Sequence, residues 1–244
     1  METPTAPTPP AEMNVFSRIV NVFLSPSETF NYLMTKPDWI TPVIVMIILF
    51  LGSGILLKDI IQAEQIKAMR VQIMKSDRVP DNQKEQVIEQ QTQMMKSFWA
   101  VGYVIGLVAI LIMYFIGAVF LMVGGNNVLG GKATYIQVLS IFGYSLMIDI
   151  LATLVKVPIM FVNSTMRVDT GLGLFAAADQ TRSALYAFLS KFDLFTFWQL
   201  AVLVIGISML FKFSKGKSAG LVFGLWLVWV LLGTGLTALG LNFG

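Results

Sequence analysis

The stretch Phe98–Val123, FWAVGYVIGLVAILIMYFIGAVFLMV, decides the fold, because its 26 residues contain no charge. An α-helix rises about 1.5 Å per residue, so about 20 mostly apolar residues cross the roughly 30 Å of hydrocarbon in a bilayer. Inside lipid, the backbone N–H and C=O groups must bond within their own segment. The stretch therefore predicts a transmembrane α-helix over residues 98–123.

Four further apolar stretches complete the pattern. Only one of them contains charged residues, namely Asp149 and Lys156. The two 18-residue stretches are short for a crossing, but neighbouring aromatic side chains can extend them into the interface. We therefore expect an all-α integral membrane protein, a bundle of five transmembrane helices. The four additional spans cover residues 40–57, 136–162, 194–211 and 221–241.

The composition agrees with a membrane protein and excludes several chemistries. Of all residues, 56% are hydrophobic and 13% are charged, whereas soluble domains carry about 25% charged residues. The chain has no Cys and no His, which excludes disulfides, thiol nucleophiles, Ser-His catalysis and the usual zinc sites. We see no carboxylate cluster and no nucleophile beside a base, so we expect no enzyme, cofactor or metal. The basic residues are scattered or balanced by acids, so we expect no nucleic-acid partner.

The N-terminal region precedes a predicted transmembrane domain of residues 37–244. Residues 1–11 are rich in Pro and Thr and are expected to form a disordered tail. Residues 12–36 predict two amphipathic helices that lie in the membrane interface. The first places its apolar side chains on one face and Arg18 among the polar side chains of the other face.

The second interfacial helix carries its own start and stop signals. Ser25 stands three residues before Glu28, which predicts a capping box. The helix should end before Pro37, because the residue before a proline avoids the helical region.

The segment between the first two spans, residues 58–97, differs from the rest of the chain. It holds seven basic and six acidic residues and no Gly. Apolar residues repeat at helical spacing on both sides of Pro80. We therefore predict a helical hairpin between spans 1 and 2, which could project from the membrane or lie on it. Besides the lipid bilayer, protein partners of this hairpin are the expected contacts.

The loop charges favour one orientation in the membrane. The short segment Phe211–Lys217 contains three lysines and no acid, and the C-terminal end carries no charged side chain. Short basic loops remain in the cytoplasm, and five spans then leave the N-terminus in the cytoplasm. The seven basic residues of the hairpin argue for the opposite orientation, but the rule is weaker for a long segment.

A series of short motifs runs along the chain. They are LSPSETF (24–30), KPDW (36–39), GGKATY (130–135), GYS (143–145), DLFTFW (193–198), GIS (206–208) and KGKSA (215–219). Their order and spacing over residues 15–232 resemble those of Yip1-domain proteins of the bacterial type. The resemblance implies five transmembrane helices, a cytoplasmic N-terminus, a bacterial inner-membrane location and no established enzymatic activity. Eukaryotic members are associated with Rab GTPases and vesicle trafficking, a role that we do not transfer because bacteria offer no Rab partner.

Asp149 and Lys156 are the most unusual residues of the predicted spans. Insertion scales assign about 2.5–3.5 kcal/mol to a charge at the bilayer centre. The two residues lie two helical turns apart on one face. They could form part of an ion or proton relay, or of a polar substrate pocket. Alternatively, Lys156 extends to the nearer interface while Asp149 hydrogen-bonds to another span.

Asp193 and Trp198 mark the start of the fourth span. Asp193 could place a carboxylate at the mouth of the bundle. Alternatively, it caps the helix, while Trp198 and the nearby phenylalanines form an aromatic belt at the interface.

Two pairs of glycines at four-residue spacing permit close helix contacts. They are Gly102 with Gly106 and Gly220 with Gly224. We expect them to pack the bundle within one chain rather than to mark a dimer face, although a homo-oligomer remains an alternative.

Two functions fit these observations. The first is a non-enzymatic Yip1-type membrane protein, a scaffold or organiser of membrane proteins or lipids that makes its contacts through the hairpin and the N-terminal helices. The second is a small transporter or channel that uses Asp149 and Lys156 inside the bundle.

Overall fold

The computed structural model describes residues 12–176 and 183–239. The expected tail of residues 1–11 and the end of the last span lie outside the described residues. The described part is mostly helical and contains no β-strand, apart from one isolated bridge between Gly171 and Asp193. Four of its helical segments are long and apolar enough to cross a membrane, or five when the bent pair α3–α4 counts as one span. The expected fold class is confirmed.

The chain divides into two compact units. The described residues of the first unit are 12–44, 115–149, 170–176 and 183–239, and the second unit comprises residues 45–114 and 150–169. The helices α3 (Ile40–Leu56), α5 (Lys84–Val123) and α7 (Ile148–Asn163) each contribute to both units. We describe each unit by itself.

The first unit begins with the two short helices α1 (Val15–Leu24) and α2 (Pro26–Thr35). Asn14 caps α1 by accepting a hydrogen bond of 2.8 Å from the Ser17 N–H. The predicted capping box of α2 is wrong, because the Ser25 side chain makes no capping hydrogen bond. Ser25 also terminates α1, and its N–H bonds to the Asn21 carbonyl oxygen, so the turn between the helices sets its conformation. Glu28 instead accepts a hydrogen bond of 3.2 Å from the Asn21 side chain.

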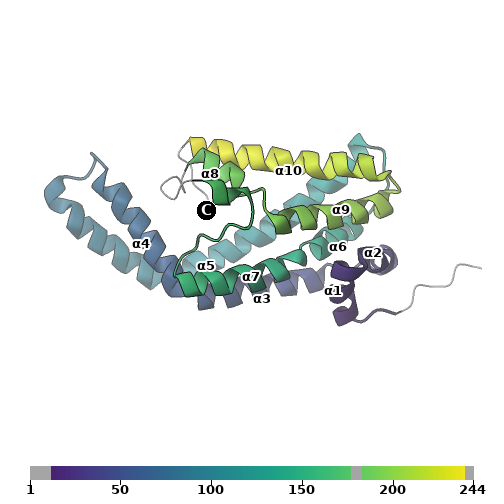
Figure 1. The fold of residues 1–244 in the computed structure, drawn as a ribbon, viewed down its shortest axis with the longest axis horizontal. Helices are drawn as coiled ribbons and strands as arrows, with labels where there is room; N and C mark the ends of the chain where they lie inside the picture. Colours follow the sequence, from purple (N-terminus) through teal and green to yellow (C-terminus); the bar gives the residue numbers. More distant parts are fainter. Residues whose placement is uncertain (1–11, 177–182, 240–244) are drawn as a thin grey trace, which may run out of the picture. The chain divides into compact units, whose positions relative to one another are not determined.

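The core of the first unit forms around α9 (Leu194–Phe211). In Figure 1, α9 lies between α10 (Lys215–Ala238) and α6 (Tyr135–Ser145), and α2 also packs against it. Gly206 makes the close packing possible, because a Cβ atom there would lie 2.4 Å from Ile141 Cγ2 and 3.1 Å from the Phe30 ring. Phe30 and Ile141 are completely buried. The glycine therefore lets α2 and α6 approach the same turn of α9.

A short irregularity at residues 146–147 separates α6 from α7, and the two helices together form one candidate span, Tyr135–Asn163. At the break, the Leu146 N–H is shared between the carbonyls of Phe142 and Gly143, at 3.2 and 3.1 Å. The Ser145 hydroxyl also donates to the Phe142 carbonyl oxygen, at 2.6 Å. This local tightening interrupts the α-helical pattern in the middle of the apolar stretch that hydropathy alone presents as one span.

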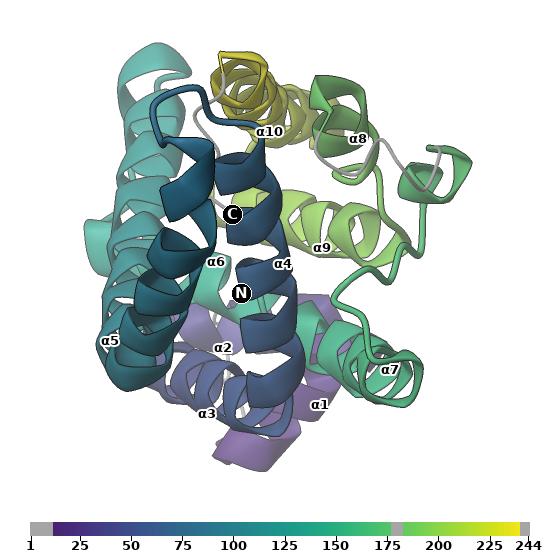
Figure 2. The same ribbon diagram turned by 90° about the vertical axis from the view of Figure 1, so that its left-hand side faces the viewer.

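The second unit contains the hairpin between the first two spans. The chain bends by 71° between α3 and α4 (Lys58–Met74). The 3₁₀ turn η1 (Asp81–Gln83) then leads into α5. Figure 2 shows α4 and the N-terminal part of α5 side by side. An ion pair of 2.8 Å joins Arg70 to Glu85 across the two arms, and the Lys84 ammonium donates to the Met74 carbonyl oxygen at 3.1 Å.

Aromatic packing joins α3 to α5 within the second unit. The Tyr103 ring lies directly over Gly54, where a side chain would overlap the phenol. The Tyr103 hydroxyl donates to the Phe50 carbonyl oxygen at 3.1 Å, and its ring lies 4.7 Å from the Phe50 ring. Trp99 packs edge-on against Tyr103, and the Lys58 ammonium lies 4.6 Å from the Trp99 ring centroid.

Shorter elements complete the first unit. The π-helical turn η2 (Gly124–Val128) follows α5, and the 3₁₀ turn η3 (Leu172–Phe175) and α8 (Ala184–Leu189) precede α9.

Candidate functional site

A buried polar cluster joins the N-terminal helices to the bundle of the first unit. It consists of Arg18 on α1, Asp38 between α2 and α3, Thr41 in the first turn of α3 and Tyr144 on α6. Arg18 Nη2 lies 3.0 Å from Asp38 Oδ2, and the Tyr144 hydroxyl donates to the same oxygen at 2.8 Å. The Thr41 N–H donates to Asp38 Oδ1 at 3.1 Å. Both carboxylate oxygens therefore accept hydrogen bonds.

The surroundings of the cluster keep its charges from water. The Arg18 and Asp38 side chains are only 11% and 17% exposed, and Tyr144 is completely buried. The Arg18 guanidinium also lies 5.2 Å from the centre of the Tyr32 ring, a distance at which a cation is attracted to an aromatic face. Buried Thr29 donates its hydroxyl to the Arg18 carbonyl oxygen at 3.1 Å, which ties α2 to α1.

The balance of forces keeps Asp38 ionised. Burial by itself would raise the pKa of this carboxyl, but the hydrogen bonds from Thr41 and Tyr144 and the charge of Arg18 outweigh it and lower the pKa below 3.8. A carboxylic acid with a lowered pKa is a poor proton donor near neutral pH. The cluster is therefore suited to holding α1, α3 and α6 together rather than to acid–base chemistry.

Sequence reasoning missed this cluster. We expected Arg18 on the polar, outward face of an interfacial helix, but its side chain points inward to Asp38. The usable signals were the motifs KPDW and GYS, which contain Asp38 and Tyr144. The sequence gives no indication that these two residues, 106 positions apart, lie in contact.

Asp193 occupies the N-cap position of α9. Its Oδ1 accepts hydrogen bonds from the N–H groups of Phe195 and Thr196, at 2.8 and 3.4 Å. Its Oδ2 accepts the hydroxyl hydrogen bond of Thr170. Asp193 is 6% exposed, so this carboxylate is buried and serves to begin the helix, as the capping alternative expected.

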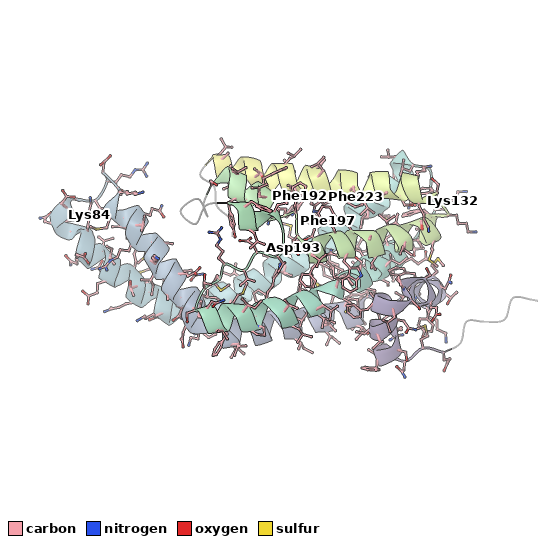
Figure 3. The ribbon with its side chains drawn as sticks, viewed as in Figure 1. Lys84, Lys132, Phe192, Asp193, Phe197 and Phe223 are labelled. Carbon is pink, nitrogen blue, oxygen red and sulfur yellow. The ribbon has the colours of Figure 1, made fainter. Side chains whose placement is uncertain are left out.

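Aromatic side chains gather around the start of α9. Figure 3 shows Phe192, Phe197 and Phe223 close to Asp193. The Phe197 ring stacks on Phe223 at 6.4 Å, and Trp226 lies 5.2 Å from Phe192. Such rings seal the contacts of α8, α9 and α10.

Trp198 lies apart from this aromatic group. It packs edge-on against Phe23 of α1, with the ring centroids 6.3 Å apart, and it is 38% exposed. It therefore contributes to seating the N-terminal helices on α9.

Asp149 and Lys156 both belong to α7. Asp149 is exposed and lies in the first turn, directly after the break of the third span. A carboxylate in the first turn interacts favourably with the helix dipole, which gives this charge a structural role. Lys156 is partly buried, two residues before Pro158.

The glycine pairs do not pack as expected. A Cβ atom at Gly102, Gly220 or Gly224 would meet no atom within 4 Å among the described residues, apart from its own helix. Gly106 alone of the four contacts a neighbour, since a Cβ there would lie 3.3 Å from the Phe50 ring. The interpretation that both pairs pack helices within one chain is therefore wrong for three of the four residues.

The described residues contain no group of three or more His, Cys, Asp or Glu side chains that could hold a metal ion. The arrangement is that of a multi-pass, all-α membrane protein in which the buried polar side chains hold helices together. The family model of the Yip1 domain matches residues 20–237, so the chain belongs to the Yip1 family. Comparison with curated proteins and with solved structures yields no match.

Proposed function

We propose that this protein is a non-catalytic organiser of the membrane, and that its hairpin binds other proteins. One observation carries the proposal: α5 continues without a break from the hairpin into the second span. Its 40 residues correspond to about 60 Å, twice the roughly 30 Å of hydrocarbon. The apolar residues 98–123 suffice to cross the bilayer, so the charged residues 84–97 extend beyond it.

The surface of the hairpin supports a role in protein binding. Its second arm exposes Met94, which is 60% exposed, beside glutamines, and Phe98, the first residue of the following span, is 62% exposed. A shallow hollow there is lined by Gln90, Gln93, Met94, Ser97 and Phe98. Exposed methionine and aromatic side chains adapt well to protein partners. The carboxylates of Asp38 and Asp193 accept several hydrogen bonds each, which supports a non-catalytic role.

Photocrosslinking in native membranes tests this proposal. A photoreactive residue at Gln93 should capture a defined set of membrane proteins, and the added substitutions Met94→Ala and Phe98→Ala should reduce the yield several-fold. The matched control is the same probe at Leu232 of α10, which is 59% exposed on a membrane-spanning helix. Identical products from both positions, or an unchanged yield after the substitutions, would contradict the proposal.

We assign the chain to the bacterial inner membrane with its N-terminus in the cytoplasm. The loop between α9 and α10 supports this orientation, since Lys212, Lys215 and Lys217 are all exposed there. The native chain has no Cys, so a single Lys215→Cys variant has no background labelling. A membrane-impermeant maleimide should label this cysteine only after cells are opened. Labelling of the cysteine in intact spheroplasts would show that the protein has the opposite orientation.

Transport is a second candidate function, which the break between α6 and α7 favours. Interrupted helices within the membrane often line substrate sites, and Asp149 follows this break directly. Lys156 lies further along the same helix. In proteoliposomes, the full chain should then carry a flux of protons or small cations that the Asp149→Asn variant loses. A flux absent from the native chain, or equal in both proteins, would exclude the role of Asp149.

A further inference from the structure

Four exposed lysines lie at one end of the first unit, on the loop after η2 and on the connection between α9 and α10, which here includes the first turn of α10. Lys132 follows η2, and Lys212, Lys215 and Lys217 surround the connection between α9 and α10. We call these four residues the lysine platform. Figure 3 shows Lys132 at the end of the unit where α9 meets α10. Neither loop, residues 124–134 nor residues 212–217, contains an Asp or Glu.

The two loops are fastened to each other. The Phe211 ring fills the space above Gly125 and Gly131, where Cβ atoms would each lie 2.3 Å from the ring. The Lys217 ammonium donates to the Leu129 carbonyl oxygen at 2.9 Å and lies 4.2 Å from the Phe213 ring centroid. Lys217 thus serves mainly as a tie between the loops. The side chains of Lys132, Lys212 and Lys215 are exposed, and the backbone that carries them is held by these contacts.

The first loop is held in shape by its own hydrogen bonds. The Asn126 side-chain amide donates to the Ala133 carbonyl oxygen and accepts from the Ala133 N–H, both at 2.9 Å. Gly130 adopts a left-handed backbone with φ of 75°, a conformation that suits glycine. Lys132 therefore stands on a rigid support close to the lysines of the other loop.

The backbone of Lys212 is unusual for a lysine. The Phe213 N–H bonds to the Ser208 carbonyl and the Lys212 N–H to the Met209 carbonyl, which is the Schellman arrangement at a helix end. Lys212 itself has φ of 56° and ψ of 36°, the left-handed conformation in which glycine is the favoured residue. Glycine would adopt this backbone conformation with less strain than lysine. The positive charge of Lys212 is therefore a reason for a lysine at this position.

The position of the platform indicates what it contacts. The helices α9 and α10 are both long and apolar enough to cross a membrane, so the short connection between them lies at a membrane surface. Val128, beside the platform, is 75% exposed and can enter the interface. Clustered lysines at this level attract anionic lipid headgroups. The phosphate groups of lipids are therefore the anions at the same depth in the membrane as these ammonium groups.

We propose that the lysine platform binds the phosphate headgroups of anionic phospholipids. Lys132, Lys212 and Lys215 supply the charge, and Lys217 holds the two loops at the spacing that lets the three act on the same headgroup region. The site is independent of any partner that the hairpin binds. It predicts a preference for anionic over zwitterionic lipids at this end of the protein.

Native mass spectrometry of the full chain in detergent tests the proposal. Phosphatidylglycerol is titrated against the native protein, against Lys132→Gln, Lys212→Gly and Lys215→Gln, and against the control Lys75→Gln, which removes an exposed lysine of the hairpin. One lysine at an anionic surface corresponds to about a fivefold change in affinity. Each platform variant should lose about that factor, while the control should bind like the native chain.

The glycine variant separates binding from folding. Lys212→Gly should keep or raise the melting temperature while it lowers lipid affinity, because it relieves the left-handed strain. Unchanged phosphatidylglycerol affinity in all three platform variants would overturn the proposal, as would an equal loss in Lys75→Gln. Equal affinity for phosphatidylcholine would also overturn it. Displacement of the lipid by millimolar inorganic phosphate would reassign the platform to a free ion.

Discussion

Removal of Arg18 from the buried polar cluster should strongly destabilise the protein. The Arg18→Met variant keeps much of the side-chain volume but leaves the Asp38 carboxylate with hydrogen bonds from Thr41 and Tyr144 only. At the separation of 3.0 Å, the attraction of the two charges amounts to roughly 5–6 kcal/mol at an effective dielectric constant of about 20. Desolvation of both groups opposes this attraction, so the net value of the pair is much smaller.

The expected loss follows from the charge that is left behind. Breaking a buried ion pair by removing one partner costs about 3–5 kcal/mol. Because the two side chains remain 11% and 17% exposed, we expect Arg18→Met to lie at about 3 kcal/mol, the lower end of this range. Tyr144→Phe removes one hydrogen bond to a charged acceptor and should cost about 1.5–3 kcal/mol.

The assay is reversible unfolding in mixed micelles, followed by tryptophan fluorescence, for the single variants Arg18→Met and Asp38→Asn and for the double variant. The double variant should be more stable than the sum of the single losses predicts, by about 0.5–3 kcal/mol. Lys36→Met is the control: its ion pair with Glu12 has a similar N–O distance, 3.1 Å, but is 57% and 90% exposed, so no shift should be resolved. Strict additivity of the two single losses would refute the coupling, whatever their size.

Four further outcomes follow from the packing and the charges. Gly206→Ala should cost about 1–3 kcal/mol, because its methyl would lie 2.4 Å from an Ile141 methyl carbon; an unchanged thermal midpoint would contradict this contact. Asp193→Ala should lose about 0.5–2 kcal/mol with the cap of α9, which Asp193→Asn should partly restore. Tyr103→Phe should lose about 1 kcal/mol with its hydrogen bond to α3, and equal stability would show that water replaces this bond. Folding lowers the pKa of Asp38, so its contribution to stability is complete well above the ordinary carboxyl pKa and is lost as the pH falls through the lowered pKa. Proteolysis of α1 by an acid protease should therefore accelerate at that low pH, and an unchanged rate would contradict the role of the carboxylate.

The membrane spans were predictable because bilayer thickness fixes the length of an apolar helix. The predicted fourth span, residues 194–211, coincides with α9. The predicted fifth span began at residue 221, but α10 begins at Lys215 because Ser214 accepts a capping hydrogen bond from the Lys217 N–H. Hydropathy locates the part of a helix inside lipid, whereas the cap determines where the helix begins.

The contacts of the polar cluster were beyond the reach of the sequence. Helical periodicity correctly separates Arg18 from the apolar face of α1, but it does not distinguish a polar face that meets water from one that meets a buried carboxylate. That distinction depends on Asp38 and Tyr144, which periodicity within α1 does not include. The break of the third span was hidden for a related reason, since the two residues at the break, Leu146 and Met147, are neither charged nor proline.

The motifs that suggested the family meet in space, which explains how short patterns can mark a fold. KPDW and GYS supply Asp38 and Tyr144 to the buried polar cluster, while GGKATY and KGKSA supply Lys132, Lys215 and Lys217 to the lysine platform. These motifs therefore describe how the first unit is assembled and how it meets the membrane surface. None of them falls within the hairpin, residues 58–97. Membership of the Yip1 family thus accounts for the helical frame, and the hairpin is the place to test for the partner that we propose, because none of the family motifs restricts its side chains.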